Sequence, residues 1–207
     1  MGCPDSILNL IESFKKLPGI GEKSAERLAF SIIDLEKEDV ENFSKSLLAV
    51  SNNIKTCSKC NHITENDICD ICADSGRDSN TLCVVEDAKS VIMFEKLSVY
   101  NGLYFVLDGL ISPLDKIGPE DINLDKLIER IKNENIKEVI LAIKPTIEGE
   151  TTSLYILKLL EEINSSSNPE TKVEISRIAH GIPLGVDMEY IDSLTLELAL
   201  QDRKKIS

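Results

Sequence analysis

The chain has 207 residues, of which 42% are hydrophobic and 4% aromatic, and a formal net charge of −13. This length permits one large domain or two to three small ones, and the acidic balance argues against a dedicated, tight nucleic-acid binder while leaving room for a local basic face. The sequence holds no run of about 18 apolar residues and no secretory signal, so we expect a cytoplasmic protein with reduced cysteines and no membrane partner.

Three helices are predicted in about the first 55 residues. Asp5 is expected to cap the first helix, whose apolar residues recur at i, i+3, i+4 and i+7: Ile7, Leu10, Ile11 and Phe14. After the helix-breaking stretch "LPGIG", a second helix is expected to place on one face Ala25, Leu28, Ala29, Ile32 and Ile33. A third is expected to carry Val40, Phe43, Leu47, Val50 and Ile54.

The connection between the first two helices combines glycines with positive charge. Gly19 and Gly21 permit a tight turn and let a ligand's backbone come close, and the amides that open the second helix can hold a phosphate. Basic side chains flank the turn on both sides: Lys15, Lys16, Lys23 and Arg27. The pattern is not a P-loop, because Glu22 stands where a glycine is required and a helix precedes the turn. Two interpretations stay open: a phosphate-contacting turn, and a plain helical hairpin that packs on a core.

Four of the six cysteines form two Cys-x-x-Cys pairs: Cys57, Cys60, Cys69 and Cys72. Two such pairs can complete a tetrahedral site of four thiolates, which favours Zn²⁺ with iron second. Four thiolates leave no open coordination position, so we expect one structural ion per chain and no catalysis there. Redox-active cysteines and disulfides are the remaining alternatives. Since the segment has few apolar residues, metal binding has to supply its folding energy.

The apolar pattern changes its period after the cysteine segment. Four short, β-branched runs predict strands, at residues 81–86, 103–107, 137–143 and 172–178. Helical stretches separate them, near residues 88–97, 124–133 and 151–163, and a last helical pattern covers 187–205. This alternation predicts a mostly parallel sheet covered by helices. Cys83 lies in the first strand and is expected to pack in the core.

Acidic residues follow two of the predicted strands. Glu86 ends the first strand, and Glu148 and Glu150 follow the third. Because ligand sites in open α/β sheets lie at the carboxyl ends of strands, these carboxylates could converge and bind Mg²⁺, which would permit phosphoryl transfer. The alternative, slightly favoured by the residues alone, is that they are solvated acids near helix starts.

The last predicted strand is followed by a turn rich in glycine and proline that leads to Asp187. A strand that ends near an acid is similar to a Walker B segment. No Walker A motif accompanies it, so ATP hydrolysis is not expected. The alternative is a strand-to-helix turn in which Asp187 caps the last helix.

Six motifs follow one another along the chain: "LPGIGEKSAERLAF", the four-cysteine segment, "CVVED", "SPLDKIGPEDI", "KPTIEGETTSLYI" and "GIPLGVDMEY". In this order they closely resemble the bacterial RecR family of recombination mediators, over nearly the whole chain. The resemblance implies an α+β multi-domain fold. Its expected parts are a helix-hairpin-helix DNA-binding domain at 1–55, a C4 zinc finger at 56–76, an α/β Toprim domain with a mostly parallel sheet at 80–175, and a Walker B-like strand–helix assembly segment at 176–207.

The resemblance also implies roles for individual residues. Lys23 and Arg27 would face DNA, within a binding set that also holds Lys15, Lys16, Gly19 and Gly21. The cysteines would hold zinc. Glu86, Glu148 and Glu150 would form a Toprim face that is linked to partner binding and has no established catalysis. Gly185 and Asp187 would serve assembly. Three positions differ from the common family pattern: Lys144 (often Asn), Val186 (often Gly) and Asp108 (often Gly or His).

Proteins of this family form ring-shaped tetramers built from dimers. With RecO, and in some cases RecF, they help to load RecA onto single strands coated by single-strand-binding protein. The resemblance therefore implies a non-enzymatic mediator of recombinational DNA repair, cytoplasmic and nucleoid-associated. It would bind single- and double-stranded DNA through weak, salt-sensitive contacts that a ring repeats. The alternative is a Mg²⁺-dependent Toprim phosphotransferase or nuclease, for which the chain offers no evident nucleophile.

Overall fold

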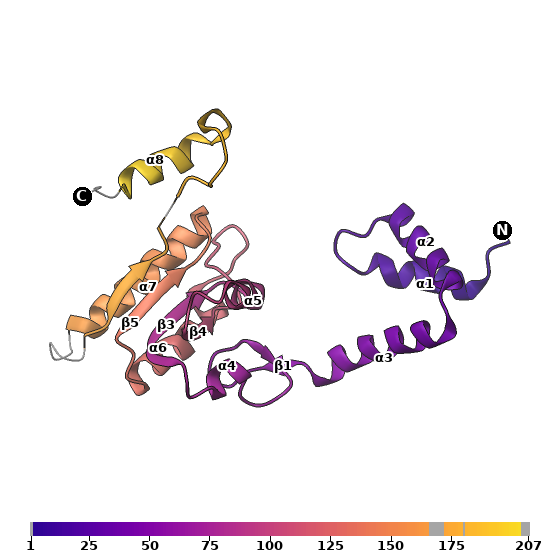
Figure 1. The fold of residues 1–207 in the computed structure, drawn as a ribbon, viewed down its shortest axis with the longest axis horizontal. Coiled ribbons are helices and arrows are strands. Elements are labelled where there is room, and N and C mark those ends of the chain that lie inside the picture. The colour runs from indigo at the N-terminus through magenta and orange to yellow at the C-terminus, as the bar shows by residue number, and fades with distance from the viewer. Residues whose placement is uncertain (1, 166–171, 180, 204–207) are drawn as a thin grey trace. The chain divides into compact units, whose positions relative to one another are not determined.

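The structure, a computed structural model, describes residues 2–165, 172–179 and 181–203. The chain divides into two compact units, residues 1–54 and 55–207 (Figure 1). Each unit has its own hydrophobic core. No helix in the described residues is long and apolar enough to cross a membrane.

The first unit is helical, as the spacing of its apolar residues predicts. Its elements are α1 (Asp5–Lys15), α2 (Glu22–Ser31), the 3-10 turn η1 (Ile32–Asp34) and α3 (Lys37–Asn53). The small core lies between α1 and α2, where Ile11 packs against Ala25 and Ala29. The two alanines have short side chains, so the helices can approach closely and bury this seam.

Three expectations for the first unit need correction. Asp5 is the first residue of α1 and not its cap; Pro4 holds the cap position without a side-chain hydrogen bond. Ile33 lies in η1 and is 61% exposed, because α2 ends before it and the apolar face does not continue. The helix α3 forms as predicted but ends at Asn53, so Ile54 follows it and is not part of it. None of the residues of α3 is buried, and its apolar side chains Leu47 and Val50 are exposed.

The second unit is built on a four-stranded sheet in which every strand is parallel to its neighbours. In spatial order the strands are β4 (Gly102–Val106), β3 (Asp78–Val85), β5 (Glu138–Ala142) and β6 (Glu174–Arg177). The connecting helices are α5 (Ala88–Leu97), α6 (Leu124–Asn133) and α7 (Ile147–Ser165), with the 3-10 turn η2 (Pro119–Asp121) before α6. The predicted strands, helices and parallel sheet are confirmed.

Successive residues of β3 point to opposite faces of this sheet. Leu82 and Val84 enter the larger core, which includes residues of α6 and α7. Cys83 and Val85 enter a smaller core with Val91 of α5. Cys83 is therefore buried as predicted, and burial raises the pKa of its thiol to about 12. Helices cover both faces of the sheet, which explains why the strands are apolar throughout.

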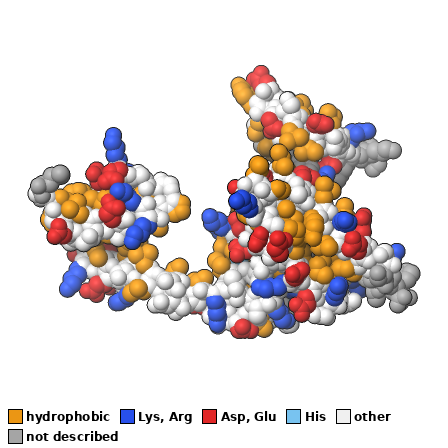
Figure 2. All heavy atoms as spheres, turned by 180° about the vertical axis from the view of Figure 1, so that it is seen from behind, with side chains coloured by type: hydrophobic (Ala, Val, Ile, Leu, Met, Phe, Trp, Pro, Cys, Tyr) orange, Lys and Arg blue, Asp and Glu red, His pale blue; other side chains and the backbone are white. Residues whose placement is uncertain are grey.

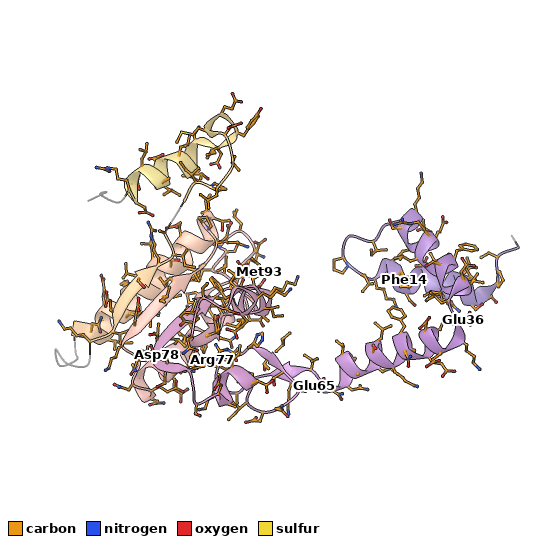
Figure 3. The ribbon with its side chains drawn as sticks, in the orientation of Figure 1. Phe14, Glu36, Glu65, Arg77, Asp78 and Met93 are labelled. Carbon is orange, nitrogen blue, oxygen red and sulfur yellow. The ribbon has the colours of Figure 1, made fainter. Side chains whose placement is uncertain are left out.

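The cysteine segment lies against the edge of this sheet. It contains β1 (Lys55–Thr56), β2 (Ile63–Thr64) and α4 (Asp70–Ala73). Strand β4 is the outermost strand on this side, and its Val106 amide donates a hydrogen bond to the Cys60 carbonyl (2.9 Å). Arg130 of α6 donates through Nη1 to the carbonyls of Tyr104 (2.9 Å) and Lys59 (3.4 Å). Figure 3 labels Glu65 in this segment and Arg77 and Asp78, where β3 begins.

The C-terminal part continues β6 through the 3-10 turn η4 (Met188–Tyr190) to α8 (Ser193–Gln201). The cap of α8 is Asp192, whose Oδ1 accepts from the Thr195 amide (2.9 Å). Asp187 precedes η4, so the expectation that it caps the last helix is wrong. Residues 204 and 205 of the predicted closing helix lie outside the described residues.

Candidate metal centre and nucleic-acid interface

The four predicted cysteine ligands come together in one cluster. Their sulfur atoms all lie within 4.8 Å of one another, and the sulfurs of Cys60 and Cys69 are 3.5 Å apart. Backbone amides point at three of the sulfurs: Cys69 N at Cys57 Sγ (3.3 Å), His62 N at Cys60 Sγ (3.5 Å) and Cys72 N at Cys69 Sγ (3.5 Å). Each pair thus forms a knuckle whose backbone turns around a common point.

This donor set fits a zinc ion. In a tetrahedron with Zn–S bonds of about 2.3 Å, sulfur atoms stand about 3.8 Å apart, which is compatible with the cluster. The contact with Cys60 lowers the pKa of the Cys69 thiol, and the same contact raises the pKa of Cys60. Four thiols this close cannot all ionise without a cation among them. The core of the segment consists largely of the cysteines themselves, so the ion would hold it together; His62 is not part of the ligand group.

The turn between α1 and α2 explains its two glycines. Gly19 has a φ of 80°, in the left-handed region that other residues rarely adopt. Gly21 has an extended backbone and is the residue before α2. A Cβ at either position would meet no atom within 4 Å. Packing therefore does not demand glycine at Gly21, and the open space leaves the first amides of α2 accessible to a ligand.

The four basic residues of the hairpin are not equivalent. Lys15 Nζ pairs with Glu12 (2.8 Å) and Glu22 (2.6 Å), and the hydrogen bonds to these carboxylates raise its pKa. Within the described part of the chain, Lys16, Lys23 and Arg27 form no ion pair, and all three are exposed. These three side chains supply the positive charge that can reach a phosphate backbone.

The predicted acids lie at the carboxyl edge of the sheet but are not alone there. Glu86 directly follows β3, and its Oε1 accepts from Nζ of Lys144, which follows β5, at 2.8 Å. Glu148 and Glu150 lie in the first turn of α7, and Arg177 at the end of β6 approaches Glu150 (3.4 Å). In the described residues, the four cysteines are the only group of three or more potential ligands close enough to hold a metal. The structure therefore does not gather Glu86, Glu148 and Glu150 into one metal site.

Lys144 and Arg177, the partners of Glu86 and Glu150, are not among the predicted site residues. The sequence shows only that each stands at or just after the end of an apolar run. Which acids they meet depends on the strand order of the sheet, β4-β3-β5-β6. On the face of the second unit seen in Figure 2, acidic and basic side chains are interspersed.

Comparison with protein families accounts for nearly the whole chain. Family models match as follows: a RecR helix-hairpin-helix at residues 7–51, a RecR zinc finger domain of the four-cysteine type at 54–74, a Toprim domain at 80–179 and a RecR C-terminal region at 181–204. The chain belongs to the RecR family. Its α1–α2 hairpin lies in the RecR helix-hairpin-helix, and its cysteine cluster lies in the RecR zinc finger and fits one structural Zn²⁺. RecR domains support DNA binding and a role as a recombination mediator.

Proposed function

We propose that this protein is a non-enzymatic mediator of recombinational DNA repair. It acts with RecO, and with RecF where that protein is present, to help load RecA onto single-stranded DNA. The observation that carries the proposal is the hairpin of the RecR type, on which Lys16, Lys23 and Arg27 are exposed and form no ion pair in the described residues.

DNA contact is proposed to centre on this hairpin. The open amides at the start of α2 and the cations Lys23 and Arg27 are suited to phosphate oxygens and not to base edges, so binding is independent of sequence. Lys16, Gly19 and Gly21 complete the contact surface, and Lys15 takes a smaller part because Glu12 and Glu22 already neutralise it. Few charges per chain give weak binding to single and double strands that falls steeply with salt.

Assembly into a ring tetramer built from dimers would multiply these weak contacts. Two helices support such assembly, because they expose apolar side chains that a single copy leaves in water. On α3 these are Phe43, Leu47, Leu48 and Val50, and on α8 they are Leu194 and Leu200. Gly185, with a φ of 80°, and Asp187 shape the segment that leads to α8 and are proposed to serve the assembly.

The Toprim edge is proposed to dock RecO and not to catalyse a reaction. Glu148 and Glu150 stand in the first turn of α7, where they can meet a basic partner. Glu86 is proposed as a further part of this docking surface. We propose the domain bounds that the family motifs imply, at 1–55, 56–76, 80–175 and 176–207. The proposed cellular location is the nucleoid region of the cytoplasm.

Charge reversal tests the hairpin assignment. In a filter-binding or anisotropy assay, the variant Lys23→Glu/Arg27→Glu should bind DNA at least about tenfold more weakly, with a salt dependence reduced by about one unit per lost contact. The matched control is Lys132→Glu/Lys158→Glu, which makes the same change of net charge on exposed positions of α6 and α7. If the two variants lose the same affinity, the effect is one of overall charge and the hairpin is not the contact surface.

A further inference from the structure

The carboxyl edge of the sheet has one place where a ligand is expected. The chain runs from β3 to its neighbour β4 on one side, and then crosses to β5 on the other side. The gap between the carboxyl ends of β3 and β5 is therefore the topological switch point, where open α/β sheets bind their ligands. Glu86 comes directly after β3, and Lys144 comes two residues after β5, so these two side chains face each other across this gap.

An ion pair occupies this place. Nζ of Lys144 lies 2.8 Å from Oε1 of Glu86, and the side chains are 51% and 25% exposed respectively. The hydrogen bond to Glu86 raises the pKa of Lys144, and the charges of Glu148 and Asp87 act in the same direction. Three carboxylates, two that follow β3 and one in α7, therefore favour the charged form of this ammonium group.

The backbone of Lys144 is held in place as well. Its carbonyl accepts a hydrogen bond from the Thr146 amide (2.9 Å), and the Thr146 hydroxyl accepts one from the Gly149 amide (3.2 Å). A Cβ at Gly149 would collide with the carbonyl oxygen of Lys144. Gly149 is thus required for the tight turn from β5 into α7, and this turn directs Lys144 towards Glu86.

We propose that Lys144 is a built-in cation that takes the place of a divalent metal at the Toprim edge, so that this edge works without Mg²⁺. Mg²⁺ requires several oxygen ligands in near-octahedral arrangement. Glu86, which directly follows β3 at the switch point, already has the ammonium group of Lys144 as its partner, so its carboxylate is not available as one of these ligands. A second cation at the same carboxylate would meet the charge of Lys144 at close range. This inference concerns metal dependence and holds whether or not RecO docks on the edge.

The test uses Mn²⁺ as a spectroscopic probe for a divalent cation, with the zinc-loaded full-length protein. The free Mn²⁺ signal in electron paramagnetic resonance measures binding to the wild type, to Lys144→Met, and to Lys144→Met/Glu86→Gln. Lys144→Met should bind Mn²⁺ at least about tenfold more tightly than the wild type, because a neighbouring positive charge is gone. The double variant should lose this gain. The control Lys158→Met removes the same charge from an exposed position of α7 and should leave Mn²⁺ binding unchanged.

Two results would overturn the proposal. The first is that the wild type binds Mn²⁺ as tightly as Lys144→Met does, while the variant Glu86→Gln no longer binds it. Lys144 would then not exclude a divalent cation from Glu86. The other is Lys144→Met that keeps its zinc and its circular dichroism spectrum yet binds Mn²⁺ no better than the wild type. Lys144→Ala, with a shorter side chain, checks that methionine itself does not block the site.

Discussion

Arg130 is predicted to hold the cysteine segment, residues 55–73, against the sheet. Its side chain is 5% exposed, and its guanidinium donates to the buried Tyr104 carbonyl at 2.9 Å and, less closely, to the Lys59 carbonyl at 3.4 Å. It also pairs with Glu134 at 2.9 Å. A charged hydrogen bond contributes about 1.5–3 kcal/mol, and a buried carbonyl left without a donor costs about 1–3 kcal/mol.

These values set the expected effect of Arg130→Met, which keeps most of the apolar stem. The Glu134 carboxylate is 32% exposed and can turn to water, so its pair contributes little. The long Lys59 contact also counts for little. The loss of the Tyr104 bond then dominates, and the second unit should lose about 2–4 kcal/mol of unfolding free energy.

Because Arg130 and Cys72 line one cavity of about 500 Å³, the variant also removes positive charge beside the thiolate centre and should release zinc faster to a chelator.

Denaturant unfolding and chelator competition check both effects. The matched control is Lys132→Met, which removes one positive charge from an exposed position of the same helix. It should change the unfolding free energy by less than about 0.5 kcal/mol. If Arg130→Met is as stable as this control and holds zinc as long, the guanidinium does not fasten the module to β4.

Cys69→Ser should abolish stoichiometric zinc, measured by metal analysis, and unfold the module locally while the main core of the sheet stays folded. Gly19→Ala should cost the first unit about 1–2 kcal/mol in thermal unfolding, since its φ of 80° is strained for alanine; a cost no larger than that of Gly21→Ala would refute the strain. Glu95 accepts from Arg77 (3.0 Å) and from the Tyr104 hydroxyl (2.8 Å), and the hydrogen bond from Arg77 lowers its pKa. The stabilisation is present above the unfolded value of about 4.3 and is lost as pH falls through the lower folded pKa, so the stability gap between wild type and Glu95→Gln should close in acid.

The elements of the fold were predictable because their signals are local. Helical spacing on α1 and the β-branched runs of β3 and β5 each identify an element from neighbouring residues. The cysteine spacing predicts the metal site in the same way, since the two cysteines of each pair are close in sequence and form their own knuckle. Helix ends were less predictable. Asp187 precedes the 3-10 turn η4 and Asp192 precedes α8, and only the hydrogen bond from the Thr195 amide identifies Asp192 as the cap of the last helix.

The partners of charged residues were not predictable, because they depend on the order of strands in the sheet. Glu86 and Lys144 are 58 residues apart in sequence and meet only because β3 lies beside β5. In the same way, Arg130 looks like an ordinary surface residue in the last turn of an amphipathic helix. It becomes buried because the cysteine module covers that end of α6 and the edge of β4.

This arrangement gives the zinc ion a role in the sheet as well as in its own segment. An edge strand presents unpaired backbone groups that can pair with another chain, and proteins commonly cover such edges. Here the cover for β4 is a knuckle whose core is made largely of cysteines, with the Cys60 carbonyl bound to the Val106 amide at 2.9 Å. The knuckle has little apolar surface with which to keep its shape. The ion that closes it therefore also keeps β4 covered, and loss of zinc should convert a paired edge into an exposed one.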